Sequence, residues 1–306
     1  MATITIKLAD QKSIELEAGS TAEDLAKKLN LTAPDQALAA SINGINCDLS
    51  QPLADGDEVK LINFSDPDGK EIFWHSSAHI LAQAVLRLWP NAKPTIGPPI
   101  ENGFYYDFAD LHITEEDLPK IEKEMEAIVK ANYKTEKETL PNKEAGLKAF
   151  ENNKYKTEMI EEFGNAVLTT YRQGEFYDLC RGPHIPYLGK IKALKVLKLS
   201  GAYWRGDHRR EMLTRVYAIT YPDRKMLKQY LYCLEEAKKR DHKVLGPKLD
   251  LFSLHEEAAG MPFIHPHGMI VWNGLLDYWR KCHEKAGYVE IKTPIMMSRE
   301  LWERSG

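Results

Sequence analysis

Apolar and polar side chains alternate strictly near the start of the chain. Residues 3–8 (TITIKL) and 13–16 (SIEL) carry an apolar side chain at every second position, which is the period of a half-buried β-strand. The turn-forming residues between them join the two strands as a hairpin. Apolar side chains then recur at helical spacing over residues 22–29, after a capping-box pattern made by Ser20 and Glu23. The sequence therefore predicts a β-hairpin followed by a short helix.

Further strand signals follow this helix. Asn43–Gly44 is the preferred dipeptide of a tight hairpin turn, and it lies between residues 39–42 and 45–47. Residues 59–62 (VKLI) alternate again and predict a last strand. The order of strand, strand, helix and further strands is typical of a β-grasp-like domain, which we place at residues 1–64. This segment carries no obvious catalytic group, so we interpret it as a binding or spacer domain.

A turn-rich stretch at residues 64–70 precedes a helix whose apolar residues nearly encircle it. This helix contains His75 and His79, and it must end near Trp89 because Pro90 cannot continue it. The all-round apolar character predicts that the helix is central to its domain. The elements expected after it are a strand at 104–108, a helix capped by Thr114, helical segments within 143–163, a strand at 213–221, and a helix at 269–286 followed by a strand ending at Pro294. The stretches 166–171 and 196–199 lie between these elements and are not assigned to either type.

The length of 306 residues is more than one hydrophobic core usually serves, so we expect several domains. The predicted fold class is α+β. The expected divisions are the β-grasp-like domain at 1–64, an α+β domain at 65–221, a linker helix at 222–243 and a further segment at 244–306. We see no internal repeat and no low-complexity segment.

The composition is that of a soluble globular protein, with 43% hydrophobic and 28% charged residues. No apolar stretch reaches the ~18 residues of a membrane span, and the start lacks the regions of a signal peptide. Four scattered cysteines do not form a disulfide framework in a chain this long, which favours a reducing compartment. We therefore expect a cytoplasmic protein without membrane contact. Its net charge of −4 means that local basic patches would have to hold a nucleic acid.

Two segments about a hundred residues apart carry the candidate chemistry. His75 and His79 project from one helical face because they are four residues apart. Cys180 and His184 offer a thiol and an imidazole across the tight turn of the sequence DLCRGPH. If the fold brings the segments together, the four groups could bind a soft divalent metal such as zinc. They could equally position a water and stabilise an attacked carbonyl group, and the residues alone leave both possibilities open.

Basic residues gather near the predicted linker. Residues 238–243 (KKRDHK) form the most basic stretch of the chain, and with Arg205, His208, Arg209 and Arg210 they could contact phosphate groups. A solvated helix end, favoured by the helix dipole, explains the same charges equally well. Taken alone, Lys156 is interpreted as a surface lysine.

The motifs together make the sequence similar to a known family. The chain resembles the amino-terminal half of threonyl-tRNA synthetases, which are class II aminoacyl-tRNA synthetases. Residues 1–64 resemble the TGS domain of that family, and the segment from the long helix to Pro294 resembles class II motif 1. As a set these motifs are highly specific. They are His75-x3-His79, DLCRGPH at 178–184, GAYWRGD at 201–207 and RDH at 240–242.

The resemblance implies that residues 65–221 form an editing domain, which hydrolyses serine wrongly attached to the threonine tRNA. Serine lacks one methyl group of threonine, and a pocket converts that difference into only ~1–3 kcal/mol, so a second, hydrolytic site is needed. By matching motifs, His75 and Lys156 would orient the attacking water, and Asp178 would recognise polar groups of the amino acid. The residues implied as catalytic are His75, His79, Lys156, Cys180 and His184, and those expected to bind substrate are Tyr106, Asp178 and Arg205.

Bacterial members of the family are understood to edit without a metal, so the resemblance opposes a zinc site at the His/Cys cluster. Residues 244–306 resemble only the start of a class II catalytic domain with an antiparallel sheet. The sites for ATP with Mg²⁺ and the ligands of a threonine-binding Zn²⁺ would lie beyond Gly306. The implied full-length parent attaches L-threonine to tRNA(Thr) with ATP and forms a homodimer through motif 1, whereas this chain alone is expected only to edit. The alternatives are a free-standing zinc-dependent hydrolase and a non-catalytic RNA-binding module.

Overall fold

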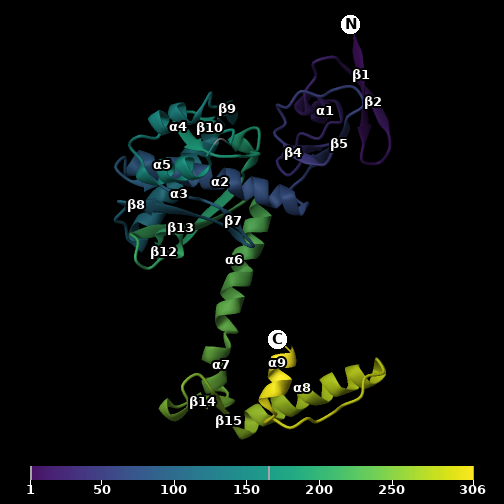
Figure 1. The fold of residues 1–306 in the computed structure, drawn as a ribbon, viewed down its shortest axis with the longest axis vertical. Helices are drawn as coiled ribbons and strands as arrows, with labels where there is room; N and C mark the ends of the chain where they lie inside the picture. The colour runs from purple at the N-terminus through teal and green to yellow at the C-terminus, as the bar shows by residue number, and fades with distance from the viewer. Residues whose placement is uncertain (1, 165, 306) are drawn as a thin grey trace. The chain divides into compact units, whose positions relative to one another are not determined.

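The structure is a computed structural model that describes residues 2–164 and 166–305 (Figure 1). Met1 and Gly306, the outer ends of the first and last expected domains, lie outside the described residues. Contacts divide the chain into two compact units, residues 1–230 and residues 231–306. Both helices and sheets are present in each unit, which confirms a mixed α+β chain of several domains. Each unit is described by itself.

The β-grasp domain of the first unit is a five-stranded sheet packed against one helix. The strand order is β2-β1-β5-β3-β4, in which β1 and β5 are parallel and the other neighbours are antiparallel. The predicted hairpins are therefore confirmed, including the turn at Asn43–Gly44. Its elements are β1 (Thr3–Leu8), β2 (Ser13–Glu17), α1 (Ala22–Lys28), β3 (Ala39–Ile42), β4 (Ile45–Cys47) and β5 (Glu58–Ile62).

The predicted capping box of α1 was wrong by one residue. Thr21 is the last residue with extended backbone before the helix, and its hydroxyl accepts the backbone N–H of Asp24 at 3.3 Å. The Asp24 carboxylate in turn accepts the backbone N–H of Thr21 at 2.9 Å. Thr21 and Asp24 therefore form the box, while the predicted partner Glu23 forms an ion pair with Lys27.

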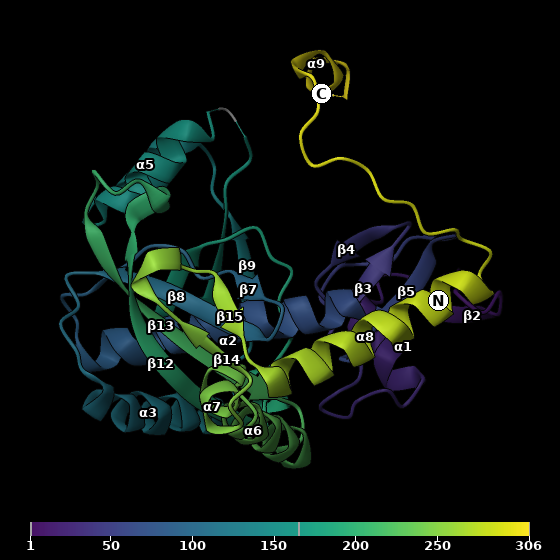
Figure 2. The same cartoon turned by 90° about the horizontal axis from the view of Figure 1, so that it is seen from below.

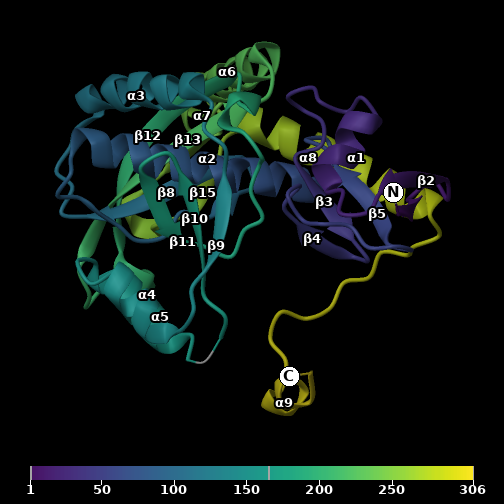
Figure 3. The same cartoon turned by 90° about the horizontal axis from the view of Figure 1, so that it is seen from above.

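The α+β domain, residues 67–221, is organised around helix α2 (Pro67–Leu88). This helix is buried along most of its length, as its all-round apolar sequence predicts, and it packs against β8, β13 and α3. Strands β12-β13-β8-β6 form one sheet, with β7 also paired to β8, and β11-β10-β9 form a second, smaller sheet. Helices α3 and α5 lie on opposite sides of the domain (Figures 2 and 3).

The expected strands at 104–108 and 213–221 and the expected helices are present in this domain, and the structure adds further strands. Its strands are β6 (Lys93–Pro94), β7 (Pro99–Ile100), β8 (Gly103–Ala109), β9 (Glu136–Thr139), β10 (Thr169–Gln173), β11 (Phe176–Leu179), β12 (Ala193–Tyr203) and β13 (Met212–Tyr221). Its helices after α2 are α3 (Leu118–Ala131), α4 (Lys143–Ala149) and α5 (Lys154–Glu162), with short 3-10 turns η1 (Glu115–Asp117), η2 (Leu188–Lys190) and η3 (Trp204–Gly206).

Helix α6 (Arg224–Lys239) follows, and the boundary between the two units falls within it. The second unit then contains a two-stranded hairpin and a long helix, α8, with many exposed apolar side chains. Among residues 2–164 and 166–305, no helix is both long and apolar enough to cross a membrane. The remaining elements are α7 (His242–Lys248), β14 (Phe252–Leu254), η4 (Glu256–Ala258), β15 (Pro262–Ile264), α8 (Pro266–Lys285) and α9 (Arg299–Ser305).

The strand expected to end at Pro294 is not formed. Residues 288–296 have no regular structure, and Val289 and Ile291 are 84% and 77% exposed. A strand needs a hydrogen-bonded neighbour, and the described part of the chain offers none to this segment. Among the described residues of this unit, β14 and β15 pair with each other as a two-stranded hairpin, and no further strand joins them.

Candidate active site

A cavity of about 720 Å³ lies within the α+β domain. Its walls come from α2, the strap at residues 95–99, strand β8, helix α5 and the end of β11. Of the eight residues singled out from the sequence, six line this cavity; His184 lies behind its wall and Arg205 lies elsewhere. The six are His75, His79, Tyr106, Lys156, Asp178 and Cys180.

The two histidine-bearing segments meet at one wall of this cavity. Cys180 Sγ lies 3.2 Å from His75 Nε2 and 3.1 Å from His184 Nε2. One candidate ligand atom from each of His75, His79, Cys180 and His184 lies within 4.8 Å of the others. The structure therefore brings together the three imidazoles and the thiol that the sequence places on separate segments.

Strand pairing explains how Cys180 reaches the helix. Strand β11 runs antiparallel to β10, with Asp178 opposite Tyr171, and the chain leaves β11 directly at Cys180. The following turn needs glycine at position 182, where φ is +68°. A Cβ atom there would also overlap the Tyr171 hydroxyl. The turn sequence thus sets the distance between Cys180 and His184.

Burial keeps this cluster uncharged at neutral pH. It lowers the pKa of His75 to about 4 and that of His79 to about 3, and it lowers the pKa of His184 well below the ordinary value. Burial also raises the pKa of the Cys180 thiol to about 12. The imidazoles are therefore available as proton acceptors, and the sulfur is a protonated thiol rather than a nucleophilic thiolate.

Ser76 fixes the proton position on His184. The Ser76 hydroxyl donates to the carbonyl oxygen of Ile72 at 2.8 Å, so its oxygen can only accept from His184 Nδ1, 3.0 Å away. The unprotonated Nε2 of His184 then faces Cys180 Sγ and accepts the thiol proton. His79 Nδ1, by contrast, is buried and has no hydrogen-bond partner among the described residues.

A buried ion pair forms the opposite wall. Lys156 Nζ lies 2.6 Å from Asp178 Oδ1, and the two side chains are 3% and 4% exposed. The Tyr106 hydroxyl donates to Asp178 Oδ2 at 2.5 Å, and the Leu179 backbone N–H donates to Oδ1 at 2.8 Å. Burial, reinforced by Asp178, raises the pKa of Tyr106 far above its usual range, so its hydroxyl stays a donor. The carboxylate is therefore held in one orientation by three donors.

The strap that carries Gly97 closes over Tyr106. Thr95 is anchored to Asp107, because its backbone N–H and its hydroxyl both donate to the Asp107 carbonyl at 2.9 Å. A Cβ atom at Gly97 would overlap the aromatic ring of Tyr106. Glycine at this position therefore lets the backbone lie directly against the ring.

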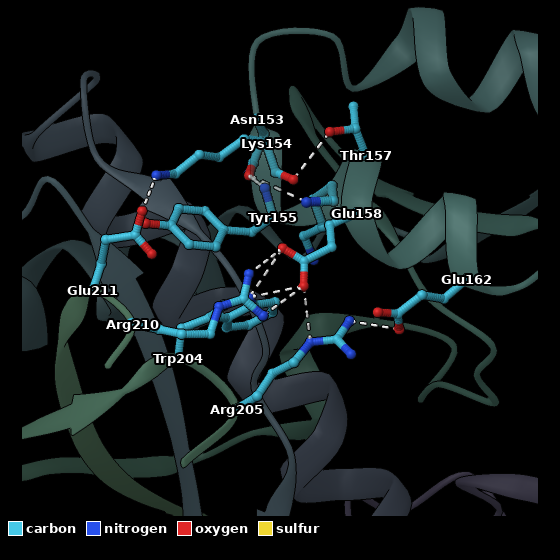
Figure 4. Close-up of polar contacts among 11 residues, drawn as sticks. Asn153, Lys154, Tyr155, Thr157, Glu158, Glu162, Trp204, Arg205, Arg210 and Glu211 are labelled. Atoms are coloured by element: carbon cyan, nitrogen blue, oxygen red, sulfur yellow. Dashed lines mark hydrogen bonds and ion pairs between the residues drawn. The ribbon is translucent and has the colours of Figure 1, made fainter. Parts of the chain in front are cut away.

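Arg205 takes part in a separate polar network, outside the cavity lining (Figure 4). Its guanidinium group pairs with Glu158 at 3.3 Å and with Glu162 at 2.6 Å. Glu158 also accepts from both guanidinium NH2 nitrogens of Arg210, at 2.8 and 2.6 Å, and from Trp204 Nε1 at 3.2 Å. These contacts fasten helix α5 to the turn between β12 and β13.

The sequence analysis did not single out three residues that support the cluster: Ser76, Tyr171 and Asp48. Ser76 lies next to His75, and the sequence indicates only that it is a small residue on a buried helix. Asp48 is distant in sequence from Cys180, whereas Tyr171 lies on the neighbouring strand β10. Both act through contacts between elements, for which the sequence carries no local signal. Asp48 accepts the His184 backbone N–H at 2.8 Å and the Tyr171 hydroxyl at 2.7 Å.

Comparisons with known proteins identify two family domains in this chain. A family profile described as the TGS domain matches residues 4–63. A second profile, described as the second additional domain of threonyl and alanyl tRNA synthetases, matches residues 168–217. The second match includes Asp178, Cys180, His184 and Arg205, whereas His75 and Lys156 lie outside it.

Similar proteins cover almost the whole chain. The threonine–tRNA ligase of Protochlamydia amoebophila is 66% identical over 302 residues, which are 98% of this chain and 46% of the relative. That of Chlamydia trachomatis is 53% identical over 298 residues, 97% of this chain and 47% of the relative. That of Desulfatibacillum aliphaticivorans is 51% identical over 303 residues, 99% of this chain and 48% of the relative.

The chain spans about half the length of the curated relatives it matches. The first family match lies within residues 1–64 and the second lies within residues 65–221. Over nearly all of its length, the chain is therefore related to the amino-terminal part of threonine–tRNA ligases.

Proposed function

We propose that the cavity of the α+β domain hydrolyses the ester bond of serine wrongly attached to tRNA(Thr). The observation that carries this proposal is the set of groups that meet at one cavity, in a chain related to threonine–tRNA ligases. A neutral imidazole, a buried ammonium group and a fixed carboxylate are what ester hydrolysis by a positioned water requires. The cavity volume of about 720 Å³ is within the usual range for small-molecule sites, and it suits an aminoacylated nucleotide end.

His75 is the residue best placed to accept a proton from the attacking water. The thiol proton of Cys180 is donated to His184, so Sγ is left to accept from His75 Nε2 at 3.2 Å. The other ring nitrogen of His75, Nδ1, then carries the lone pair that can take the proton. A pKa of about 4 keeps that nitrogen unprotonated at neutral pH.

Lys156 and Asp178 supply charge at the other wall. The Lys156 ammonium group can orient the water and stabilise the negative charge that develops on the attacked carbonyl oxygen. Its position is fixed by Asp178, which is itself held by Tyr106. The polar groups of the serine moiety would bind to Asp178. His79, Cys180 and His184 would hold His75 and the cavity wall in place, and Arg205 would act only through the network that fastens helix α5.

The remaining functions are proposed from the relatives, about half of whose length this chain spans. A full-length threonine–tRNA ligase of this kind would attach L-threonine to tRNA(Thr) using ATP with Mg²⁺, and it would bind Zn²⁺. It would act in the cytoplasm. Exposed apolar side chains on α8 support dimerisation through this helix in the parent, as motif 1 does in the family. They include Ile270, Val271, Trp272, Leu275, Tyr278 and Trp279.

The test is to incubate the purified chain with Ser-tRNA(Thr) and, separately, with Thr-tRNA(Thr). We expect serine to be released faster than threonine, and His75→Ala to abolish the difference because no base remains to activate the water. Equal release of the two amino acids, or release at the rate of the reaction without protein, would contradict the proposal.

A second candidate function rests on the donor set of the cluster. Three imidazoles and one thiol within 4.8 Å are a suitable donor set for zinc. His79 Nδ1 has no hydrogen-bond partner among the described residues, so this nitrogen is available as a metal ligand. If three of these donors held a zinc ion, its fourth position would be open to a water, whose pKa the metal would lower towards neutrality. Stoichiometric zinc in the purified chain, with hydrolysis lost on chelation and restored by zinc, would favour this function. Full hydrolysis by chelator-treated, metal-free chain would contradict it.

A further inference from the structure

The carboxylate of Asp48 belongs to the β-grasp domain, yet both of its oxygens bind the α+β domain. Oδ1 accepts the backbone N–H of His184 at 2.8 Å, and Oδ2 accepts the hydroxyl of Tyr171 at 2.7 Å. Asp48 directly follows strand β4 and is half-buried. Hydrogen bonds to an ionised carboxylate are stronger than those between neutral groups. One side chain therefore fixes two points of the neighbouring domain.

Both points belong to the support of the cavity wall. The ring of His184 lies 3.1 Å from Cys180 Sγ and is packed against Tyr171, with ring centroids 4.3 Å apart. The Tyr171 hydroxyl in turn lies so close to Gly182 that a Cβ atom there would overlap it. A displacement of His184 or Tyr171 would therefore move the turn that carries Cys180.

The turn itself has few internal restraints. Residues 180–186 form no helix or strand, and the backbone N–H groups of His184 and Ile185 donate to the side chains of Asp48 and Ser76. Beyond the turn, the Tyr187 hydroxyl donates to Glu23 at 3.1 Å. Lys190 Nζ donates to the carbonyl oxygens of Ala33 and Gln36, at 2.9 and 2.7 Å. The β-grasp domain thus holds this loop at three successive places.

We propose that Asp48 is a positioning residue of the hydrolytic site, and that the β-grasp domain is in this way a structural part of that site. Asp48 acts on the cavity through the His184 backbone and through Tyr171, and it does not contact the substrate. The inference rests on the proposed function, because it concerns the rate of the same hydrolysis. It also changes the role of the first 64 residues, which the sequence alone presents as a binding or spacer domain.

The test compares Asp48→Ala and Asp48→Asn with a matched control, Asp57→Ala. Among the described residues, the Asp57 carboxylate accepts hydrogen bonds within the β-grasp domain only, from the Ala54 backbone N–H and from Asn43, each at 2.8 Å. In Asp48→Ala we expect the single-turnover rate of serine release to fall about tenfold to hundredfold. The chain concentration that gives half of the maximal rate should stay unchanged, because substrate contacts remain.

The other two variants separate positioning from general damage. Asp48→Asn keeps an oxygen that can accept from His184, so it should retain more activity than Asp48→Ala. Asp57→Ala should keep the wild-type rate even if its melting temperature falls. A rate for Asp48→Ala within about threefold of wild type, or an equal loss in Asp57→Ala, would overturn the inference.

A spectroscopic readout keeps the inference separate from the proposed function. In chain labelled with ¹⁵N-histidine, the ring signal of His184 is identified by its loss in His184→Gln. We expect Asp48→Ala to shift this signal and Asp57→Ala to leave it in place. If the wild-type chain releases serine, the release rates of the Asp48 and Asp57 variants test the inference. If it does not, the proposed function fails, and an unshifted His184 signal in Asp48→Ala would overturn the inference by itself.

Discussion

Helix α5 carries two ion pairs, two residues apart, in opposite surroundings. The side chains of Lys156 and Asp178 are 3% and 4% exposed, whereas those of Arg210 and Glu158 are 35% and 30% exposed. Burying two charges costs several kcal/mol of desolvation, which their attraction only partly offsets, whereas a partly solvated pair avoids most of that cost. The outer pair is therefore explained as a fastening of α5, and the inner pair needs another explanation. The cavity it faces provides one.

The two pairs also differ in how easily they can be replaced. Glu158 accepts from Arg210, Arg205 and Trp204, so the loss of one donor leaves the others in place (Figure 4). The Asp178 carboxylate has Lys156 as its charged partner in the cavity wall. The comparison teaches that the same helix is fastened by a redundant outer network and carries a non-redundant inner pair.

The largest expected effect comes from breaking the inner pair. Lys156→Met leaves the Asp178 carboxylate buried without a cation, so the free energy of unfolding should fall by about 3–5 kcal/mol. Denaturant unfolding of the two proteins measures this change. The double variant Lys156→Met/Asp178→Asn removes the stranded charge and should recover most of the stability but not hydrolysis. If the double variant were as unstable as the single one, the buried charge would not be the cause.

A second expected effect concerns acid. Burial lowers the pKa of His79 from 6.5 to about 3, so below pH 6.5 the unfolded chain binds a proton that the folded chain does not. The free energy of unfolding is therefore unaffected by this group above pH 6.5, and it decreases as the pH falls from 6.5 towards 3. At about pH 5 one such histidine costs about 2 kcal/mol.

The His79→Gln variant lacks this titrating group. Between about pH 7.5 and about pH 5, we expect the wild type to lose about 2 kcal/mol more stability than the variant does. Arg210→Ala, which alters only the outer network, should follow the wild-type pH profile. A constant difference between wild type and His79→Gln across this range would contradict the neutral, buried cluster.

A smaller effect is expected at the strap over Tyr106. In Gly97→Ala the new methyl group overlaps the Tyr106 ring, so stability should fall by about 1–3 kcal/mol. Hydrolysis should also slow, because the displaced ring no longer holds Asp178. Gly274→Ala in helix α8 is the control, since a Cβ there meets nothing within 4 Å. Equal stability and activity in both variants would show that the strap has room to move.

The smallest effect is expected in the outer network. Arg210→Ala removes two hydrogen bonds to Glu158 that water screens, so the free energy of unfolding should fall only slightly. Hydrolysis should be unchanged, because Arg205 and Trp204 still hold Glu158 and the position of α5. A loss of hydrolysis as large as that of Lys156→Met would remove the distinction between the two networks.

Much of the fold was predictable because it follows local periodicity. Short-range sequence patterns predict the β-grasp strands, the Asn43–Gly44 turn and the buried helix that ends before Pro90. The prediction failed where two neighbouring residues could serve as a cap, at Ser20 and Thr21. It failed again near residues 289–294, where the strand lacks a partner in the described part of the chain.

The candidate site was predictable in its residue types but not in its supports. The spacing of His75 and His79 and the turn at Cys180 identified the cluster. By its local sequence alone Lys156 is a lysine like its neighbours; the family resemblance singled it out, and the structure places it beside Asp178. Asp48 lies more than a hundred residues before His184, and no local pattern could indicate that the two residues are bonded.

The most direct test of the account is the single-turnover rate of serine release from Ser-tRNA(Thr) by three proteins. They are the wild-type chain, Lys156→Met and Lys154→Met. Lys154 lies on the same helix as Lys156 but pairs with Glu211 at the surface. The account predicts that Lys154→Met keeps the wild-type rate and that Lys156→Met loses about a hundredfold or more. Equal rates in all three proteins, or an equal loss in both variants, would contradict it.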